Sequence, residues 1–372
     1  METLFDNMII QKDMKEIEES NIVDFRKIMN KTFLITGSTG MLPSYLVYFL
    51  IFLNEKNPEN NIRIIAQARN PEKVKERFGK YSLKSYFRCI LQDVCDKMQL
   101  DEPIDYIIHG ASLASPQFYG TNPVETLLPN VLGTFHLLEL AKAKSVQSFL
   151  FFSSGEVYGT VENRDKISEQ DYGYLNPLNI RSCYGESKRM GENMCVSWYH
   201  EYQVPAKSIR IHHTYGPTMD IDNDKRVFSE FVANVVHKES IIMKSDGSPI
   251  RPFCYITDAV RAFLIVLLDG ENGEAYNMGN PDCMISMGDL ARELISIKPE
   301  YKLTLTLQPR LDGNGYLENK HPNTAAVDID KIKKLGWEPK ISIQEGFRRT
   351  VESLISRGEK RDEENQHCYS NL

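Results

Sequence analysis

Residues 32–43 read Thr-Phe-Leu-Ile-Thr-Gly-Ser-Thr-Gly-Met-Leu-Pro. Residues 32–36 predict a short apolar strand, and residues 37–40 predict a tight turn bounded by two glycines. An apolar helix is expected to follow over 41–53. In doubly wound α/β sheets, a turn of this kind lets backbone N–H groups and a helix N-terminus approach a pyrophosphate. A plain strand–helix turn is the alternative interpretation as long as the stretch is considered alone.

The residues that follow continue an alternation of strands and helices. Further strands are expected at 62–67, 87–93, 105–109, 148–153 and 207–212, and further helices at 71–78, 124–143 and 184–202. Such alternation predicts βαβ units with a parallel sheet. The predicted fold class is α/β, a Rossmann-type doubly wound parallel sheet with a smaller C-terminal α/β substrate lobe.

Four segments are expected along the chain. Residues 1–30 predict an amphipathic helical extension that packs on the body or on a second subunit, and residues 31–205 predict the dinucleotide-binding domain. Residues 206–356 predict the smaller lobe, interleaved with the last strands of the sheet. Residues 357–372 form a polar tail that we expect to fray.

The composition excludes several classes of function. The 372 residues are 41% hydrophobic and carry a net charge of −7, which argues against nucleic acid as a partner. The longest apolar run, 45–53, is far shorter than the roughly 20 residues that span a bilayer. Seven cysteines without a Cys-x-x-Cys pair argue against a disulfide framework and a zinc site, so no metal is expected and a reducing cytoplasm fits best.

The ends of the first strands supply candidate cofactor contacts. The third glycine position of the turn is Pro43, which a first helical turn tolerates, although local packing must differ. Asp93 ends the third strand, where a carboxylate can accept a hydrogen bond from an adenine amine. Asn130 is either a cofactor contact or a buried structural residue. The candidate cofactor-binding residues are Gly37, Thr39, Gly40, Met41, Leu42, Arg69, Asp93, Val94, Gly110, Ala111, Ser112, Asn130 and Lys188.

Arg69 bears on the choice between NAD and NADP. At the end of the second strand an acidic residue would hold the ribose 2′-hydroxyl of NAD, whereas a nearby arginine accommodates the 2′-phosphate of NADP. The chain has no acid there and has Arg69, which can equally be an ordinary surface arginine. NAD is the expected cofactor, with NADP as the alternative.

The spacing of Tyr184 and Lys188 is typical of a site that transfers protons. Four residues apart on a helix, they share one face, and a nearby cation lowers the pKa of a tyrosine from about 10. Such a tyrosine can take a proton from an alcohol while a hydride leaves the same carbon. Ser154, at the end of the strand 148–153, is expected to lie nearby and hydrogen-bond the same oxygen. Chance proximity on an exposed helix is the alternative.

Several motifs in order resemble those of the extended short-chain dehydrogenases. They are Gly37-x-x-Gly40, Asp93, His109-Gly-Ala-Ser, Asn130-Val-x-Gly-Thr, Ser154-Gly-Glu-Val-Tyr-Gly, Tyr184-x-x-x-Lys188, His213-Thr-Tyr-Gly-Pro217 and Leu335-Gly-Trp-Glu-Pro339. Together they resemble the NAD-dependent nucleotide-sugar epimerase/dehydratase group over about 31–350. Within that group the chain is most similar to UDP-glucuronate decarboxylases, in Ala114-Ser-Pro-x-x-Tyr119, Asn176-Pro-x-x-x-Arg-Ser-Cys-Tyr184 with Lys188-Arg189, and Arg251-x-Phe-x-Tyr255.

The resemblance implies oxidation of a sugar at C4 to a 4-keto intermediate. Tyr184 would be the base, Lys188 would set its pKa and anchor the nicotinamide ribose, and Ser154 would hydrogen-bond the sugar oxygen. Glu156 matches a glutamate that acts around C5, with a solvent-facing carboxylate as the plain alternative. The candidate substrate-binding residues are Ser115, Tyr119, His213, Arg226, Arg251 and Arg310.

Three departures from the group's pattern keep the second step open. Gly155 stands where 4,6-dehydratases have an aspartate, which argues against dehydration. The decarboxylases' arginine three residues before the aspartate that matches Asp328 is missing, so its role must change or fall to Arg251, Arg310, Lys320 or His321. His213 replaces an asparagine and follows His212, and each histidine can equally be structural. Two substitutions on the substrate side suggest a nucleotide sugar other than UDP-glucuronate.

Several functions therefore compete. Decarboxylation and 4-epimerisation of a nucleotide-diphosphate sugar are the main hypotheses, and 4,6-dehydration is less favoured. An NADP-linked carbonyl reductase is an alternative from another class, and the intact Ser154, Tyr184 and Lys188 argue against a non-catalytic sensor. The resemblance also implies a homodimer formed through paired long helices, one of them carrying Tyr184.

Overall fold

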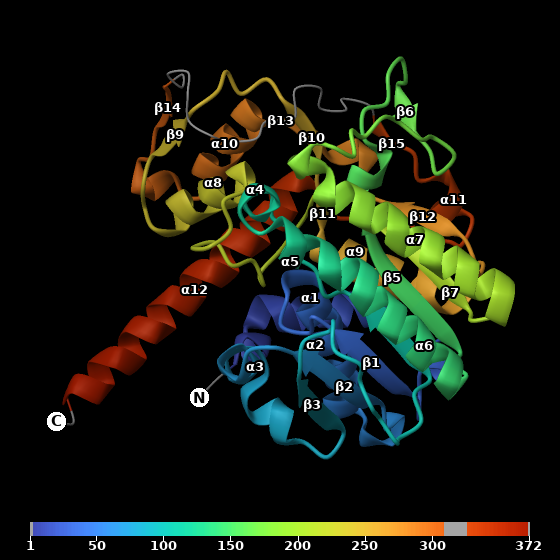
Figure 1. Cartoon of the computed structure of the whole chain (residues 1–372). Coiled ribbons are helices and arrows are strands. Elements are labelled where there is room, and N and C mark those ends of the chain that lie inside the picture. The colour runs from blue at the N-terminus through green and yellow to red at the C-terminus, as the bar shows by residue number, and fades with distance from the viewer. Residues whose placement is uncertain (1–2, 309–325, 371–372) are drawn as a thin grey trace.

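A computed structural model describes residues 3–308 and 326–370, with side chains described as far as residue 359. Its centre is a sheet of seven strands in the order β12-β7-β5-β4-β1-β2-β3 (Figure 1). The strands are β1 (Thr32–Thr36), β2 (Arg63–Ala68), β3 (Phe87–Leu91), β4 (Tyr106–His109), β5 (Ser148–Ser154), β7 (Ala206–Ile211) and β12 (Ala275–Met278). The first six agree with the sequence-based expectations to within two residues at each end.

All neighbouring strands of this sheet run parallel. β1 pairs with β2 on one side and β4 on the other, so the strand order reverses there. In doubly wound sheets ligands bind at such a reversal, outside the carboxyl ends of the strands. The predicted Rossmann-type doubly wound α/β fold is confirmed.

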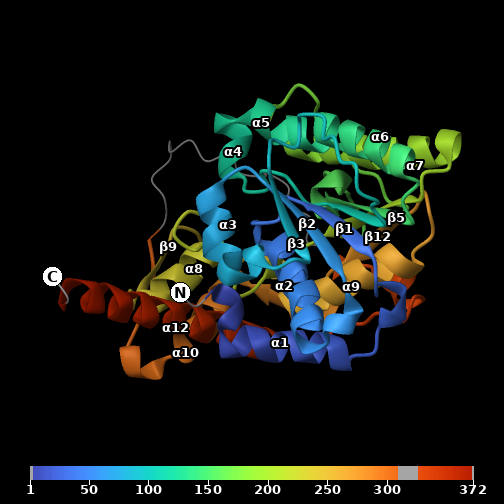
Figure 2. The same cartoon turned by 90° about the horizontal axis from the view of Figure 1, so that it is seen from below.

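Helices cover both faces of the sheet, as Figure 2 shows. α2 (Met41–Lys56) and α9 (Ile256–Asp269) pack on one face, and α6 (Thr134–Lys144) and α7 (Cys183–Tyr202) pack on the other. α2 is buried over most of its length, with Tyr45 through Ile51 inaccessible to solvent. α3 (Pro71–Phe78) connects β2 to β3.

The prediction of a single helix over 124–143 is wrong. The segment forms α5 (Pro123–Leu128), one π-helical turn at Pro129–Gly133 and then α6. Pro129 has no N–H to donate to the preceding turn, so the regular hydrogen bonding is interrupted there. Such π turns are frequent at functional sites, and Asn130 lies within this one.

The N-terminal extension packs on the body of the same chain. α1 (Met8–Glu19) buries Ile10, Met14 and Ile17, and it contacts α2, α9 and α12. A short 3-10 turn, η2 (Phe25–Lys27), then leads into β1. Of the two alternatives that the sequence left open, this structure shows the intramolecular one.

The smaller lobe is built from short elements of the C-terminal half. They are β8 (Thr214–Tyr215), α8 (Val227–Val236), β9 (Ile241–Met243), β10 (Ile250–Pro252), β11 (Cys254–Tyr255), β13 (Met284–Ser286), α10 (Met287–Ser296), β14 (Leu305–Leu307), β15 (Ala326–Val327) and α11 (Asp330–Lys333). β12 leaves this lobe to become the last strand of the main sheet. The short strand β6 (Lys166–Ile167), which comes earlier in the chain, pairs with β15 of this lobe. α4 (Gln117–Thr121) lies above the carboxyl edge.

The described part of the polar tail is helical as far as Ser370, and the expectation that the tail frays stays a prediction. α12 runs from Ile343 to Ser370 and projects from the body in Figure 1. The segment is rich in Glu, Lys and Arg, which are good helix formers and need no buried face. In the part of the chain that the structure describes, no helix is both long and apolar enough to cross a bilayer.

Candidate active site

The glycine turn after β1 lies so close to the residues that follow β4 that Gly37 has no room for a side chain. Gly37 has φ of +62°, and a Cβ there would lie 2.6 Å from the Ala111 Cα. The Gly37 N–H donates to Gln67 Oε1 at 3.0 Å, which holds the turn against β2. Gly40 caps α2 and offers no side-chain acceptor to the first N–H groups of that helix. The N–H groups of Met41 and Leu42 therefore suit the pyrophosphate of a dinucleotide.

Pro43 fits because it faces another glycine. A Cβ at Gly110, just after β4, would lie 2.6 Å from the Pro43 Cγ. The ring of Pro43 thus fills the space left by Gly110. This contact keeps the turn compact without a third glycine.

Replacing Gly37 with Ala should abolish tight cofactor binding. The new methyl group would meet the backbone of Ala111 in a left-handed conformation, which costs roughly 1–3 kcal/mol before the clash is counted. NAD titration by intrinsic fluorescence or calorimetry would measure the loss, with Gly336→Ala, which has φ of +95° and no neighbour within 4 Å, as the control for conformational strain alone. Equal NAD affinity in Gly37→Ala and wild type would contradict this use of the turn.

Asp93 and Arg69 meet at the adenine end of the expected cofactor site. The Arg69 Nη1 lies 3.3 Å from Asp93 Oδ2, and Asp93 Oδ1 accepts from the Cys95 N–H at 2.8 Å. Burial alone would raise the pKa of Asp93, but the Cys95 N–H and Arg69 outweigh it and hold that pKa below its usual value. The carboxylate is thus ionised and one of its oxygens is engaged by the guanidinium. Val94, the next candidate, is buried and packs against Gly133.

Buried polar groups lie at and near the end of β4, and some of them have no hydrogen-bond partner among the described residues. His109 is buried between Thr36 Oγ1 at 2.8 Å and the Pro129 carbonyl at 3.0 Å, so it is a structural link. Burial lowers its pKa to about 3 and keeps it neutral. Among the described residues, Ser112 Oγ and Asn130 Oδ1 are buried without a hydrogen-bond partner. Because buried polar atoms are rarely left unpaired, these two fit contacts to a bound cofactor.

Ser154, Tyr184 and Lys188 meet at the carboxyl end of β5. Ser154 lies close enough to Tyr184 to lower the pKa of its phenol, and the Lys188 Nζ lies 5.6 Å from the centre of the Tyr184 ring. The Lys188 Nζ donates to the Phe152 carbonyl of β5 at 2.6 Å. Asn130 Nδ2 donates to Ser187 Oγ, whose hydroxyl donates to the Tyr184 carbonyl, so the π turn positions α7.

The expected lowering of the tyrosine pKa is absent from this structure. Burial raises the pKa of Tyr184 to about 12, the hydrogen bond with Ser154 opposes this, and Glu156 adds to it. Burial also lowers the pKa of Lys188 to about 7, because a buried ammonium is costly. The Lys188 amine is hydrogen-bonded to the backbone of β5, and Arg226, not Lys188, is the positive charge that lowers the pKa of Tyr184 here.

Glu156 is held by an arginine that the sequence did not single out. The Arg181 Nη1 lies 3.3 Å from Glu156 Oε2, and the guanidinium lies over the Tyr119 ring at 5.7 Å. Tyr119 in turn stacks on Tyr184, with ring centres 5.0 Å apart and planes 12° from parallel. Arg181 stands in the quoted motif Arg-Ser-Cys-Tyr184, so the signal was present. Only the fold shows that it meets Glu156.

His212 explains the glycine at position 155. A Cβ on Gly155 would lie 2.8 Å from His212 Cε1 and 2.9 Å from its Nδ1. The imidazole thus occupies the space that an aspartate side chain would need. Burial lowers the pKa of His212 to about 4, and its Nε2 has no hydrogen-bond partner among the described residues.

The remaining substrate candidates gather around His213. Burial lowers the pKa of His213 to about 3, and the positive charges of Arg251, His212 and Arg226 contribute. Arg226 pairs with Asp224 at 2.6 Å, and Ser115 Oγ donates to Asp224 at 3.4 Å. The structure thus brings together Ser115, Tyr119, His213, Arg226 and Arg251. Arg310, Lys320 and His321 lie outside the described residues.

Comparisons with known proteins show the family to which this chain belongs. A family model described as the NAD dependent epimerase/dehydratase family matches residues 33–279. The chain belongs to this family. UDP-glucuronic acid decarboxylase 6 from Arabidopsis thaliana is 34% identical over 321 residues, which are 86% of this chain and 87% of that protein.

Solved structures of the family share the fold. UDP-glucose 4-epimerase from Thermotoga maritima has a TM-score of 0.72 at 24% identity and covers 88% of this chain and 99% of its own. UDP-glucuronic acid 4-epimerase from Bacillus cereus, solved with NAD, has a TM-score of 0.69 at 23% identity and covers 87% of this chain and 96% of its own. The resemblance read from the motifs is confirmed: the chain is an NAD-dependent enzyme of the epimerase/dehydratase family.

Proposed function

We propose that the chain decarboxylates a nucleotide-linked uronic acid, with UDP-glucuronate as the first candidate, through a 4-keto intermediate. The observation that carries this proposal is the gathering of Ser154, Tyr184 and Glu156 at one sheet edge, with Glu156 held by Arg181. The first two groups suit oxidation at C4, and Glu156 lies beside them where the chemistry at C5 would follow. That the chain modifies nucleotide sugars with NAD follows from its family and from the decarboxylases that it resembles over most of their length.

The first step is removal of a proton and a hydride from the C4 alcohol. Tyr184 takes the hydroxyl proton, and Ser154 hydrogen-bonds the same oxygen as it becomes a ketone. NAD, bound at the turn after β1, supplies the hydride acceptor and later returns the hydride. Since the pKa of Tyr184 is about 12 without ligands, the proton transfer needs a positive charge near the phenol. Lys188, one helical turn away, is our candidate to provide it, and the charge of Arg226 already acts in that direction.

The second step uses the ketone as an electron sink. A carboxylate on C5 is β to a C4 ketone, so the C5–C6 bond can break with release of carbon dioxide while the electron pair moves onto the C4 oxygen. Tyr184 and Ser154 then donate hydrogen bonds to that enolate oxygen. C5 afterwards takes up a proton and the hydride is returned to C4. Glu156 is our candidate for the residue that acts at C5.

Replacing Glu156 with Gln should separate the two steps. We expect C4 oxidation to persist, with reduced cofactor visible by its absorbance, while release of carbon dioxide falls about 10²–10⁴-fold because general acid–base help is lost. Glu162→Gln, at an exposed acid on the following loop, is the matched control and should behave as wild type. Normal carbon dioxide release by Glu156→Gln would remove Glu156 from the mechanism.

Dehydration is disfavoured by the packing of position 155. The His212 ring fills the space beside Gly155, so no side chain can be placed there to protonate a leaving 6-hydroxyl. This agrees with the sequence-based argument against a 4,6-dehydratase.

Nucleotide-sugar 4-epimerisation is the second candidate function. The specific observation in its favour is the sequence Asn323-Thr-Ala-Ala-Val-Asp328, which lacks the arginine expected of decarboxylases. The enzyme should be incubated with a panel of UDP-, TDP-, GDP- and CDP-sugars and its products examined by mass spectrometry. Loss of carbon dioxide from a uronate supports our proposal, and an isobaric product supports epimerisation. Loss of water, or net use of NADPH on a small carbonyl compound, would contradict both.

NAD is the cofactor of the family. We propose that Arg69 does not enable the protein to bind NADP as well as NAD. Arg69 is partly engaged by Asp93 at 3.3 Å, and a 2′-phosphate would have to compete with that carboxylate. Competition binding of NADP against NAD tests this point, and equal affinities would contradict it.

We also propose that the chain forms a homodimer through α6 and α7. The two helices lie side by side, and their outer surfaces expose Phe135, Met190, Val196 and Tyr202, each more than 40% accessible. Exposed apolar residues on two neighbouring helices are consistent with an interface. Phe135→Glu should shift the protein towards monomer in size-exclusion chromatography with light scattering. Leu83→Glu, at an exposed leucine far from these helices, should have no effect; a monomeric wild type would contradict the proposal.

A further inference from the structure

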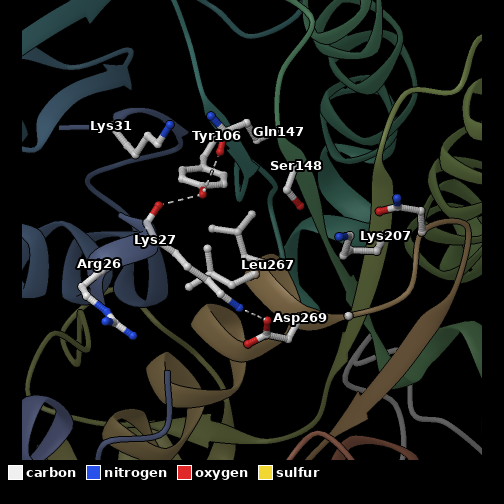
Figure 3. Close-up of a pocket in the computed structure, with 12 residues that line it drawn as sticks. Arg26, Lys27, Lys31, Tyr106, Gln147, Ser148, Lys207, Leu267 and Asp269 are labelled. Atoms are coloured by element: carbon white, nitrogen blue, oxygen red, sulfur yellow. Dashed lines mark hydrogen bonds and ion pairs between the residues drawn. The ribbon is translucent and has the colours of Figure 1, made fainter. Parts of the chain in front are cut away.

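A pocket lies at the amino ends of the central strands, whereas the candidate active site lies at their carboxyl ends. It has a volume of about 610 Å³ and is lined by the first residues of β4, β5 and β7, by the end of α9 and by η2 (Figure 3). Ser148 begins β5 and Ser154 ends it, so the pocket and the catalytic residues are separated by the length of that strand, about 20 Å. No part of the proposed reaction uses this pocket.

Lys207 on β7 is the unusual residue of the pocket. Its side chain is 4% exposed, yet among the described residues it has neither a hydrogen bond nor an ion pair within 4.0 Å. In Figure 3 its amine points towards the middle of the pocket, as does the hydroxyl of Ser148. Burial lowers the pKa of Lys207 to about 8, and the charge of Asp269 works against this lowering.

Two further polar atoms of the pocket lack partners. Ser148 Oγ and Asn272 Oδ1 are both buried without a hydrogen bond in the described part of the chain. Leaving such atoms unpaired costs roughly 1–3 kcal/mol each, so native proteins normally satisfy them with protein, water or ligand. A hydroxyl, an amide oxygen and an amine thus converge on one cavity.

The acidic residues near the pocket are already paired. Lys27 pairs with Asp269, Lys31 lies 3.2 Å from Asp105, and Arg26 lies 2.8 Å from Asp24. An acid neutralises each of these three cations. Among the described residues that line the pocket, Lys207 is then the cation without an ion-pair partner within 4.0 Å. The field inside therefore favours an anion.

We propose that this pocket binds a small anion that also carries hydroxyl groups, of the sugar phosphate class. Lys207 would pair with the phosphoryl oxygens, Asn272 Oδ1 would accept from a ligand hydroxyl, and Ser148 would bond a second polar group. The pocket volume lies within the range of roughly 300–1,000 Å³ that is usual for small-molecule sites. A ligand there would join η2 to β7 and α9 and stabilise the fold by mass action.

The test is calorimetric titration of the NAD-saturated enzyme with ribose 5-phosphate, so that the nucleotide site is already filled. We expect saturable binding to wild type and a loss of about tenfold or more in affinity for Lys207→Met. Lys12→Met, at an exposed lysine of α1 that does not line the pocket, is the matched control and should bind as wild type. Ribose and inorganic phosphate as separate probes should each bind more weakly than ribose 5-phosphate.

Lys207→Met should remain folded, because the amine that it removes makes no ion pair within 4.0 Å in the described part of the chain, and its melting temperature without ligand should equal or exceed that of wild type. No saturable binding of ribose 5-phosphate to wild type would overturn the proposal. Equal binding by Lys207→Met and wild type would overturn it as well, since the probe would then be held elsewhere. Inorganic phosphate that binds as tightly as ribose 5-phosphate would overturn the role given to the hydroxyl groups.

Discussion

Replacing Tyr184 with Phe is expected to lower turnover of the sugar substrate by about 10³-fold, since general acid–base catalysis by one residue contributes roughly 10²–10⁴. The phenol hydroxyl is the only group lost, and it is the group whose pKa Ser154 lowers. Packing of the ring against Tyr119 is unchanged by the substitution. Steady-state kinetics on the best substrate of the panel would measure the effect, together with NAD affinity, which should stay within about threefold of wild type.

Tyr119→Phe is the matched control for Tyr184→Phe. Its hydroxyl donates to the Ala114 carbonyl at 3.0 Å, so its loss removes one structural hydrogen bond worth about 1 kcal/mol. The chemical step should be little affected. If Tyr119→Phe were as inactive as Tyr184→Phe, the tyrosine pair would act through packing, and the assignment of Tyr184 as the base would fail.

Replacing Arg349 with Met should destabilise the protein by roughly 3–5 kcal/mol, because it leaves the buried Asp13 without its positive partner. Arg349, on α12, pairs with Asp13 at 2.7 Å, with Glu16 at 2.6 Å and with Glu345 at 2.7 Å. Asp13 is completely buried on α1, so Arg349 fastens the N-terminal extension to the C-terminal helix. Urea unfolding followed by circular dichroism would measure the loss.

Arg348→Met provides the control on the same helix. Arg348 pairs with Glu345 at 2.8 Å and with Glu352, but its side chain is 43% exposed, so its removal should cost no more than about 1 kcal/mol. Equal stability losses in the two variants would show that burial of Asp13 does not matter and would contradict this account of the extension.

The pH dependence of Arg349→Met gives a second check. Burial raises the pKa of Asp13 to about 6 in the folded protein, against the lowering effects of Tyr255, Tyr45 and Arg349. A carboxyl whose folded pKa is raised favours folding at low pH, and that contribution is lost as pH rises from about 4 through about 6. Without Arg349 the pKa rises further. The stability deficit of Arg349→Met should therefore shrink as pH falls from 7 towards 5.

Much of the fold was predictable because its strands are locally encoded. β1 and α3 were predicted with their observed bounds, since glycines, Pro71 and apolar runs mark where they begin and end. The interruption at Pro129 was not predicted, because the apolar pattern continues through it and only the missing N–H breaks the helix. The helical tail was missed because its polar composition is compatible with either a solvated helix or a frayed end.

The candidate site was predictable where motifs carry it and not where tertiary contacts do. Ser154 and Tyr184 were expected to meet, and they do. The pairing of Arg181 with Glu156 and the packing of His212 on Gly155 join residues from separate loops and strands, so no spacing in the sequence indicates them. The same holds for Lys207, which reads as an ordinary strand lysine until its lack of a partner is seen.

The most direct test of the central claim uses UDP-glucuronate labelled at the carboxyl carbon, with NAD present in catalytic amount. We predict release of labelled carbon dioxide over many turnovers with no net change in NAD, and loss of that release in Tyr184→Phe. Retention of the label in an isomeric uronate, or no turnover of the labelled substrate under conditions where another nucleotide sugar reacts, would contradict decarboxylation of UDP-glucuronate as the function of this site.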